Sequence, residues 1–367
     1  MNKTASDLIY LLSCSVNGIT PDKSRVQSMD LEELYYFSMN HSVQAAVCLA
    51  IEKAGVKNEK FHDAYIKAFG NNAYHDIERK AILADFEKQG IWYMPLKGII
   101  LKDIYPKSSF RQMADNDILF DAKKQYQVKD IMESHGYTTE SIGKYQHDIY
   151  TKPPVLHFEL HTELFYFADT EHLYKYYSDV KRLMKKDEGS DYSYHFSDDD
   201  NYVFVTAHEW KHFSSNGTGI RSLLDAYVYC KVKGDKLDWD YITEQCKQLK
   251  ISDFEHKRRE LALKIFSSEI LPELNNEENN MLMLYLDAGT YGKSENKFKH
   301  DIEKMGKFSF WIHSIFIPRE TMNYCVPFTA KSPLLYPVGV ICRCINLLLF
   351  NRNKIKTAIK LMKKKKD

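Results

Sequence analysis

The sequence has little that would cross-link a secreted protein. Its seven cysteines are scattered and odd in number, and no two of them form a CxxC pair. Cysteines used in this way are typical of reduced thiols rather than of a disulfide framework. The N-terminus reaches Asp7 without the uninterrupted apolar core of a signal peptide. We therefore expect a cytoplasmic protein.

Long apolar runs are also missing. The most apolar stretch, residues 334–350, is interrupted by Pro337, Arg343 and Asn346. A membrane-spanning helix needs roughly 20 consecutive apolar residues, so this stretch predicts no transmembrane segment. We expect a buried C-terminal helix here, with a helix lying at a membrane interface as the alternative.

An excess of charge of one sign is absent as well. The formal net charge is +1, whereas a protein that coats nucleic acid would be basic overall. The one clear charge run is Lys363 to Lys366. We interpret it as a solvated helix end, with binding to RNA or to an anionic membrane as the alternative. The hydrophobic content of 44% is that of an ordinary globular protein of two or three domains.

Hydrophobic spacing predicts an α+β protein in which a small mixed sheet is flanked by helical regions. Apolar residues three and four apart predict helices before residue 88 and again from about residue 170, with a polar loop over 187–200. Short β-branched and aromatic segments between them predict strands at 91–94, 116–120 and 155–164 and a hairpin over 137–151. We divide the chain into a helical N-terminal region (1–88), a core (89–167), a helical domain (168–310) and a C-terminal helical segment with a basic tail (311–367).

Two acidic residues stand at the start of the predicted strand 116–120. Asp115 and Asp117 are two apart, so their side chains point to the same face. Neighbouring carboxylates resist ionising together unless a cation lies between them, and a hard divalent ion with oxygen ligands meets this need. By the same reasoning, Asp117→Asn should hold or raise the stability of the metal-free protein.

A third acid lies on the clearest strand of the chain, 155–164. Its apolar residues alternate with His157, Glu159, His161 and Glu163. Glu159 is therefore presented between two histidines on the polar face, which suits a site. The alternative is a half-exposed edge strand whose polar face meets water.

A phosphate-binding turn is predicted upstream of these acids. Lys97 and Gly98 lie between a predicted strand and a predicted helix over 98–104, where backbone N–H groups and the helix dipole attract anions. Arg111 follows and has a side chain able to bind a phosphate with two hydrogen bonds. Lys102 and Lys107 are expected to be solvated.

Together these motifs resemble the large, mostly uncharacterised bacterial nucleotidyltransferase family of the polymerase-beta superfamily. The likeness rests on Leu96-Lys97-Gly98, Tyr105-Pro106, Arg111-Gln112-Met113, Asp115-Asn116-Asp117-Ile118-Leu119 and Glu159-Leu160-His161. It continues in the helical part, where His208 and His212 precede Arg221 and Asp225, and more weakly at Pro318, 331–337 and Arg343.

The resemblance implies a polymerase-beta-type sheet and a site for two Mg²⁺ (or Mn²⁺) ions on Asp115, Asp117 and Glu159. It also implies transfer of a nucleoside monophosphate from a nucleoside triphosphate to an acceptor hydroxyl, with release of pyrophosphate. Lys97, Gly98 and Arg111 would bind the triphosphate. The acceptor stays open among an RNA end, a sugar phosphate, a small molecule and a protein.

Two alternatives remain. His208-Glu209-Trp210-Lys211-His212 matches the HExxH pattern of zinc hydrolases, with Glu209 as the base and Asp225 as a possible third ligand. In addition, Ile99 follows Gly98 where the wider superfamily usually has Gly or Ser. A protein of the same fold that binds nucleotide without catalysis is therefore the other alternative.

Overall fold

The computed structural model describes the chain except for residues 144, 168–169, 291–305, 320–321, 324–325 and 351–367. It separates into two compact units, one of residues 1–210 with 219–290 and one of residues 211–218 with 291–367. The charge run Lys363 to Lys366 lies outside the described residues. The predicted boundaries at residues 88, 167 and 310 stay predictions.

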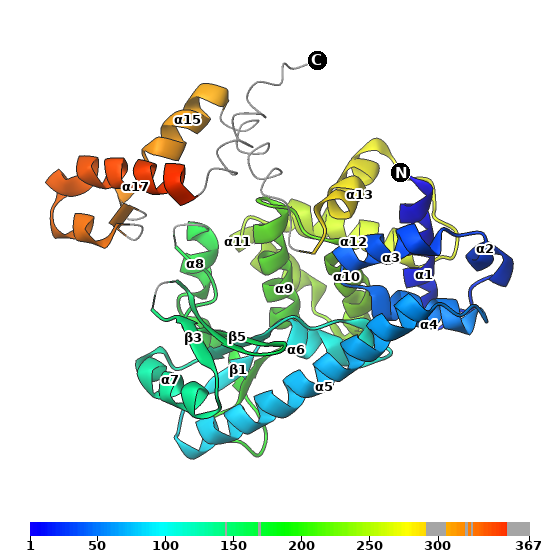
Figure 1. Cartoon of the computed structure of the whole chain (residues 1–367), viewed down its shortest axis with the longest axis horizontal. Coiled ribbons are helices and arrows are strands. Elements are labelled where there is room, and N and C mark those ends of the chain that lie inside the picture. Colours follow the sequence, from blue (N-terminus) through cyan, green and yellow to red (C-terminus); the bar gives the residue numbers. More distant parts are fainter. Residues whose placement is uncertain (144, 168–169, 291–305, 320–321, 324–325, 351–367) are drawn as a thin grey trace. The chain divides into compact units, whose positions relative to one another are not determined.

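The first unit begins with helices only. They are α1 (Lys3–Asn17), α2 (Lys23–Gln27), α3 (Leu31–Asn40), α4 (Gln44–Lys53) and α5 (Glu59–Lys88). Four of them begin after a residue whose side chain accepts a hydrogen bond from a first-turn N–H group. These residues are Asn2, Asp22, Asp30 and Asn58. The longest helix, α5, runs from the other N-terminal helices to a place beside the sheet (Figure 1).

A five-stranded mixed sheet follows, in the order β1-β2-β5-β4-β3. Its strands are β1 (Tyr93–Pro95), β2 (Asn116–Phe120), β3 (Thr138–Ser141), β4 (His147–Lys152) and β5 (Leu156–His161). β2 and β5 are parallel, and the other neighbouring pairs are antiparallel. The predicted α+β class, the mixed sheet and the β3–β4 hairpin are confirmed.

Each face of this sheet has its own hydrophobic core. Ile118 and Phe120 of β2 and Leu160 of β5 pack with residues of α5 and of α7 (Gln125–Ser134). Leu119, which points to the other face, packs with residues of the helices after residue 170. The alternation along β2 therefore buries both faces of its second half, and Asp115 and Asp117 lie at the end where the apolar residues stop.

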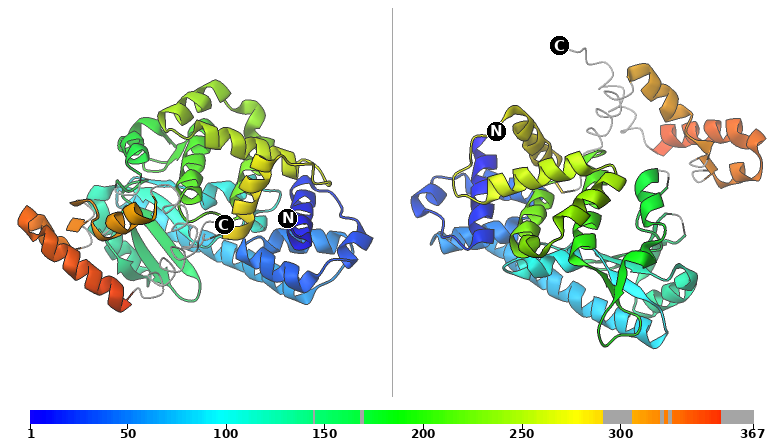
Figure 2. Two further views of the ribbon diagram at one scale, coloured as in Figure 1. Left: turned by 90° about the horizontal axis from the view of Figure 1, so that it is seen from above. Right: turned by 180° about the vertical axis from the view of Figure 1, so that it is seen from behind.

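The helices after the sheet are α8 (Glu171–Tyr177), α9 (Asp198–Phe213), α10 (Ile220–Lys233), α11 (Trp239–Gln248), α12 (Ser252–Phe266) and α13 (Asn276–Ala288). Figure 2 shows from two further sides that the N-terminal helices lie beside the last of these. A hydrogen bond from Ser13 Oγ to the carbonyl oxygen of Phe266, 2.9 Å long, joins α1 to the end of α12. The N-terminal region is thus packed against the helical domain.

Two expectations for this region are wrong. The helix predicted to reach Met184 ends at Tyr177, and the predicted loop 187–200 contains a strand. β6 (Met184–Lys186) and β7 (Tyr194–Phe196) form a small second sheet. Strands of three residues are too short for hydrophobic periodicity to reveal them, because their pairing is decided by tertiary contacts.

In the second unit, the described helices are α15 (Lys307–Ile315) and α17 (Tyr336–Phe350). Val340 is buried in α17, whereas Val338, Ile341 and Ile345 are exposed. Among residues 336–346, whose burial is described, the C-terminal helix thus has a buried side and an exposed side, and it packs on residues 327–335. No helix among the described residues is long and apolar enough to span a membrane.

Candidate active site

The two strands that hold the predicted acids lie side by side in the sheet. The parallel register pairs Asp117 of β2 with Glu159 of β5. Asp115 and His157 each lie two residues earlier in the chain, so they come next along the same face. The predicted convergence of Asp115, Asp117 and Glu159 is confirmed, while their roles in catalysis and metal binding stay predictions.

Of the three acids, Asp117 is the one whose negative charge is best compensated by neighbouring groups. Its Oδ1 atom accepts hydrogen bonds from Lys97 Nζ at 2.6 Å and from His161 Nε2 at 2.8 Å. Burial alone would raise the pKa of Asp117, but the charge of Lys97 and the hydrogen bond from His161 hold this pKa well below its usual range. Asp117 is therefore an ionised carboxylate at neutral pH.

Asp115 and Glu159 are less well compensated, because the charge of Lys97, and for Asp115 also that of Arg221, is outweighed by opposing effects. Burial, and then the charge of Asp117, raise the pKa of Glu159 to about 7 and raise the pKa of Asp115. Asp115 makes no hydrogen bond or ion pair with any other residue that the structure describes. Glu159 Oε2 lies 3.8 Å from His147 Nδ1 and 3.9 Å from His161 Nε2, beyond hydrogen-bonding distance. The charges of Lys97 and Arg221 offset only part of the charge of the three carboxylates, and oxygen ligands in this number fit a divalent cation.

The backbone at Lys97 has an unusual conformation. Its φ is 48° and its ψ is −116°, which costs a residue other than glycine about 1–3 kcal/mol. The Lys97 side chain nevertheless reaches Asp117 and is mostly buried. Strain of this kind is tolerated where the surrounding structure holds the residue, and such positions cluster at functional sites.

The predicted anion-binding helix is shorter than expected. α6 (Gly98–Leu101) has four residues and continues as a 3-10 turn over Lys102–Ile104. The N–H group of Ile99 already donates to the carbonyl oxygen of Leu96 at 3.2 Å. A helix of one turn contributes little dipole, so side chains would supply most of the attraction for an anion. Ile99 itself is buried in the core beside α5 and α7 residues.

Gly98 is required by the packing of Arg111. A Cβ atom at Gly98 would lie 2.5 Å from Arg111 Nη1 and 2.9 Å from Met113 Sδ. Arg111 is buried, and its Nε donates to Asp225 Oδ1 at 2.9 Å. Arg111 therefore lies over the start of α6 but already has a carboxylate partner, and its contact with a phosphate stays a prediction.

Asp225 is a residue whose place at the site could not be predicted from the sequence alone. Besides Arg111, Asp225 Oδ1 accepts a hydrogen bond from the Tyr105 hydroxyl at 2.7 Å. One turn earlier on α10, Arg221 Nη1 donates to the carbonyl oxygen of Gln112 at 3.0 Å. The Arg-x-x-x-Asp spacing was the signal in the sequence that could have pointed to Asp225. Together, Arg221 and Asp225 hold the segment between α6 and β2 against α10.

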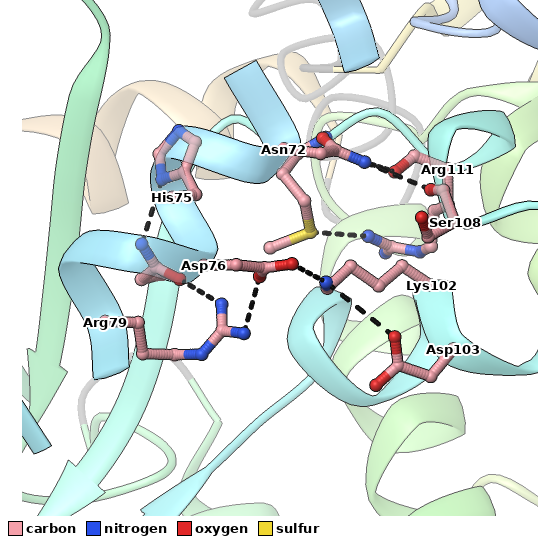
Figure 3. Close-up of polar contacts among 10 residues, drawn as sticks. Asn72, His75, Asp76, Arg79, Lys102, Asp103, Ser108 and Arg111 are labelled. Atoms are coloured by element: carbon pink, nitrogen blue, oxygen red, sulfur yellow. Dashed lines mark hydrogen bonds and ion pairs between the residues drawn. The ribbon is translucent and has the colours of Figure 1, made fainter. Parts of the chain in front are cut away.

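Behind the acids, a second polar group links α5 to the sheet (Figure 3). Asn116 points to the opposite face from its acidic neighbours, where it contacts His75 Nδ1 at 2.9 Å and accepts from Arg79 Nη1 at 2.8 Å. Asp76 accepts from Arg79 and from Lys102, each at 2.5 Å. Lys102 is only 4% exposed, so the expectation that it is solvated is wrong. The reason is that α5 brings a carboxylate to it from far away in the sequence.

The HExxH alternative is contradicted by the surroundings of Glu209. This carboxylate is buried, and Arg258 Nε donates to its Oε2 while the Tyr285 hydroxyl donates to its Oε1, both at 2.6 Å. Asp225, the suggested third zinc ligand, is held by Arg111 and Tyr105. With both oxygens bound in the core, Glu209 cannot act as a general base on water.

Comparison with protein families agrees with this geometry. A family model described as uncharacterised nucleotidyltransferase matches residues 27–267, about two thirds of the chain. The chain belongs to this nucleotidyltransferase family. It is therefore a transferase enzyme, and a nucleotide substrate is implied. The match includes α5 and the helices to α12, but not the segments at 318–343 in which the sequence also suggested a likeness.

Searches of curated proteins and of solved structures gave no match.

Proposed function

We propose that this nucleotidyltransferase moves a nucleoside monophosphate from a nucleoside triphosphate to an acceptor hydroxyl and releases pyrophosphate. The fold would be of the polymerase-beta type, and Asp115, Asp117 and Glu159 would hold two divalent ions, Mg²⁺ or Mn²⁺. When bound, such ions stabilise the charge on the attacking and leaving oxygens of an in-line displacement.

The observation that supports this proposal most is the pairing of Asp117 with Glu159 across two parallel strands. A pair of carboxylates in contact, with a third beside them, is unfavourable unless a cation compensates their charge. The raised pKa of Glu159, about 7, which burial and Asp117 cause, reflects this cost in the metal-free protein. Glu159 would position the acceptor hydroxyl or accept its proton.

Lys97 and Arg111 would bind the phosphates of the nucleotide beside the Gly98 turn. Both guanidinium and ammonium groups form strong hydrogen bonds with phosphate oxygens. Because Lys97 already contacts Asp117 and Arg111 already contacts Asp225, binding would add a phosphate to existing ion pairs. These ion pairs would hold the Lys97 and Arg111 side chains in place before the nucleotide arrives.

A non-catalytic nucleotide-binding protein of this fold is the second candidate. The observation in its favour is Ile99, but the side chain of Ile99 packs in the core, and the groups that lie against Gly98 are Arg111 and Met113. The acceptor would be an RNA end, a sugar phosphate, a small molecule or a protein.

The experiment is incubation with α-labelled nucleoside triphosphates and Mg²⁺ or Mn²⁺, together with RNA, protein and metabolite fractions. We expect label in one fraction and pyrophosphate release, with both lost in Asp117→Asn. Calorimetric titration with a non-hydrolysable triphosphate supplies the second measurement. Nucleotide binding without transfer to any fraction would favour the non-catalytic candidate, and no binding would overturn both.

A further inference from the structure

A nitrogen donor lies beside the carboxylates on the same face of the sheet. His157 precedes Glu159 by two residues on β5, and the parallel register brings it next to Asp115. One ligand atom each of Asp115, His157 and Glu159 lies within 4.8 Å of the other two. Ligand atoms of one metal ion lie this close together, so the three side chains can meet at a common ion.

The ring of His157 is available for such an ion. His157 is half-buried and makes no hydrogen bond or ion pair with another residue in the part of the chain that the structure describes. His161, by contrast, donates a hydrogen bond from Nε2–H to Asp117 Oδ1 at 2.8 Å. Of these two histidines on β5, His157 is therefore the one whose ring nitrogens are not committed.

The donor set bears on which metal the site prefers. Mg²⁺ binds oxygen ligands and keeps several waters, so an imidazole adds little to its affinity. First-row transition ions accept imidazole together with carboxylates, as in di-manganese carboxylate proteins that pair Glu with His. An imidazole among the oxygen ligands thus favours transition ions over Mg²⁺ more strongly than carboxylates alone do.

We propose that His157 is a direct metal ligand together with Asp115 and Glu159, and that it makes the site prefer a first-row transition ion such as Mn²⁺ over Mg²⁺. The proposal rests on the proposed function, because it assigns one more ligand to the same site. It gives His157 a role in metal choice that the three acids do not have.

Pulsed electron paramagnetic resonance of Mn²⁺ bound to the full chain tests this ligand directly. We expect coupling of the Mn²⁺ electron spin to an imidazole ¹⁴N nucleus in the wild type and its loss in His157→Gln. In competitive titrations, the ratio of Mn²⁺ to Mg²⁺ affinity should fall by about tenfold in His157→Gln. His195→Gln, which changes an exposed histidine of β7 paired with Asp187, should leave the spectrum and the ratio unchanged.

Two outcomes would overturn the proposal. One is wild-type Mn²⁺ without nitrogen coupling, a result that needs no variant. The other is coupling that persists in His157→Gln and disappears in His147→Gln, because ligand atoms of His147, Glu159 and His161 form a neighbouring group. Either outcome would leave nucleotide transfer with Mg²⁺ intact, whereas absence of transfer with both ions would count against the proposed function itself.

Discussion

Polar residues that are neighbours in the sequence around β2 lie on opposite faces of the strand, and the charges around them differ between the two faces. On one face, Asp115 makes no hydrogen bond or close ion pair with a described residue, and burial and Asp117 raise the pKa values of Asp115 and Glu159. On the other face, Asn116 is bonded to His75 and Arg79. The first face holds excess negative charge, whereas on the second Asp76 and Asp103 balance the charges of Arg79 and Lys102.

This difference distinguishes a candidate ligand-binding face from a face that stabilises the fold. A closed network of hydrogen bonds and ion pairs stabilises one arrangement and offers nothing to a ligand. A group of acids with incomplete compensation lowers its free energy when a cation binds, and strongly shifted pKa values are typical of functional sites. Substitutions on the two faces should therefore have different consequences, activity on one and stability on the other.

The largest effect is expected at Asp117. Asp117→Asn should lower the rate of nucleotide transfer by about a thousandfold or more, since it removes a proposed ligand and the partner of Lys97. Transfer assays at saturating nucleotide and metal measure this. Full activity in a folded variant would show that Asp117 is not a ligand.

The stability of the same variant tests the compensation of charge. Because Asp117 accepts bonds from Lys97 and His161, metal-free Asp117→Asn should lose about 1–2 kcal/mol, contrary to the expectation from the sequence that its stability holds or rises. Asp115→Asn is the matched control and should hold or gain stability, because burial and the repulsion from Asp117 outweigh the attraction of Asp115 to Lys97 and Arg221. Urea unfolding in the presence of a chelator compares the two.

On the other face, Asp76→Ala should destabilise the protein by about 2–3 kcal/mol, because it leaves the buried Lys102 without its closest carboxylate. Asp85→Ala on the same helix removes a pair with the exposed Lys88 and a contact with His135, and should cost about 1 kcal/mol or less. Urea unfolding at pH 7 gives both values. Equal losses would mean that Lys102 finds another partner.

A smaller effect concerns acid pH. Burial, and then the charge of Arg79, lower the pKa of His75 to about 4. The unfolded chain then binds more protons than the folded one between about pH 6.5 and 4, so stability falls as the pH falls through this range. We expect the wild type to lose about 2 kcal/mol relative to His75→Gln, which keeps an acceptor for Asn116 but does not titrate.

The acidic face should respond to pH in the opposite direction. With the pKa of Glu159 raised to about 7 by burial and by Asp117, the folded protein binds the extra proton between about pH 4.5 and 7. The metal-free protein therefore loses stability as the pH rises through this window, and Glu159→Gln should reduce that loss. Unfolding temperatures measured against pH for both variants separate the two faces, and a common sign would contradict the comparison.

Much of the acidic face could be predicted from local pattern. Period-two alternation placed Asp115 and Asp117 on one face, and placed Glu159 opposite the buried Phe158 and Leu160. The sequence also indicated the family, and the match over residues 27–267 confirms it. Such features are local because the direction of a side chain in a strand depends only on its position along that strand.

The sequence by itself determined that β2 and β5 would each present acids on a polar face, since alternation needs no knowledge of the rest of the chain. Only the tertiary structure decided which charges are neutralised. Asp76 of α5 meets Lys102, Asp225 of α10 meets Arg111, and Arg258 of α12 meets Glu209. Each pair joins residues at least 26 positions apart. The free energy of a buried charge depends on what lies within a few ångströms of it in space, and sequence spacing does not contain that distance.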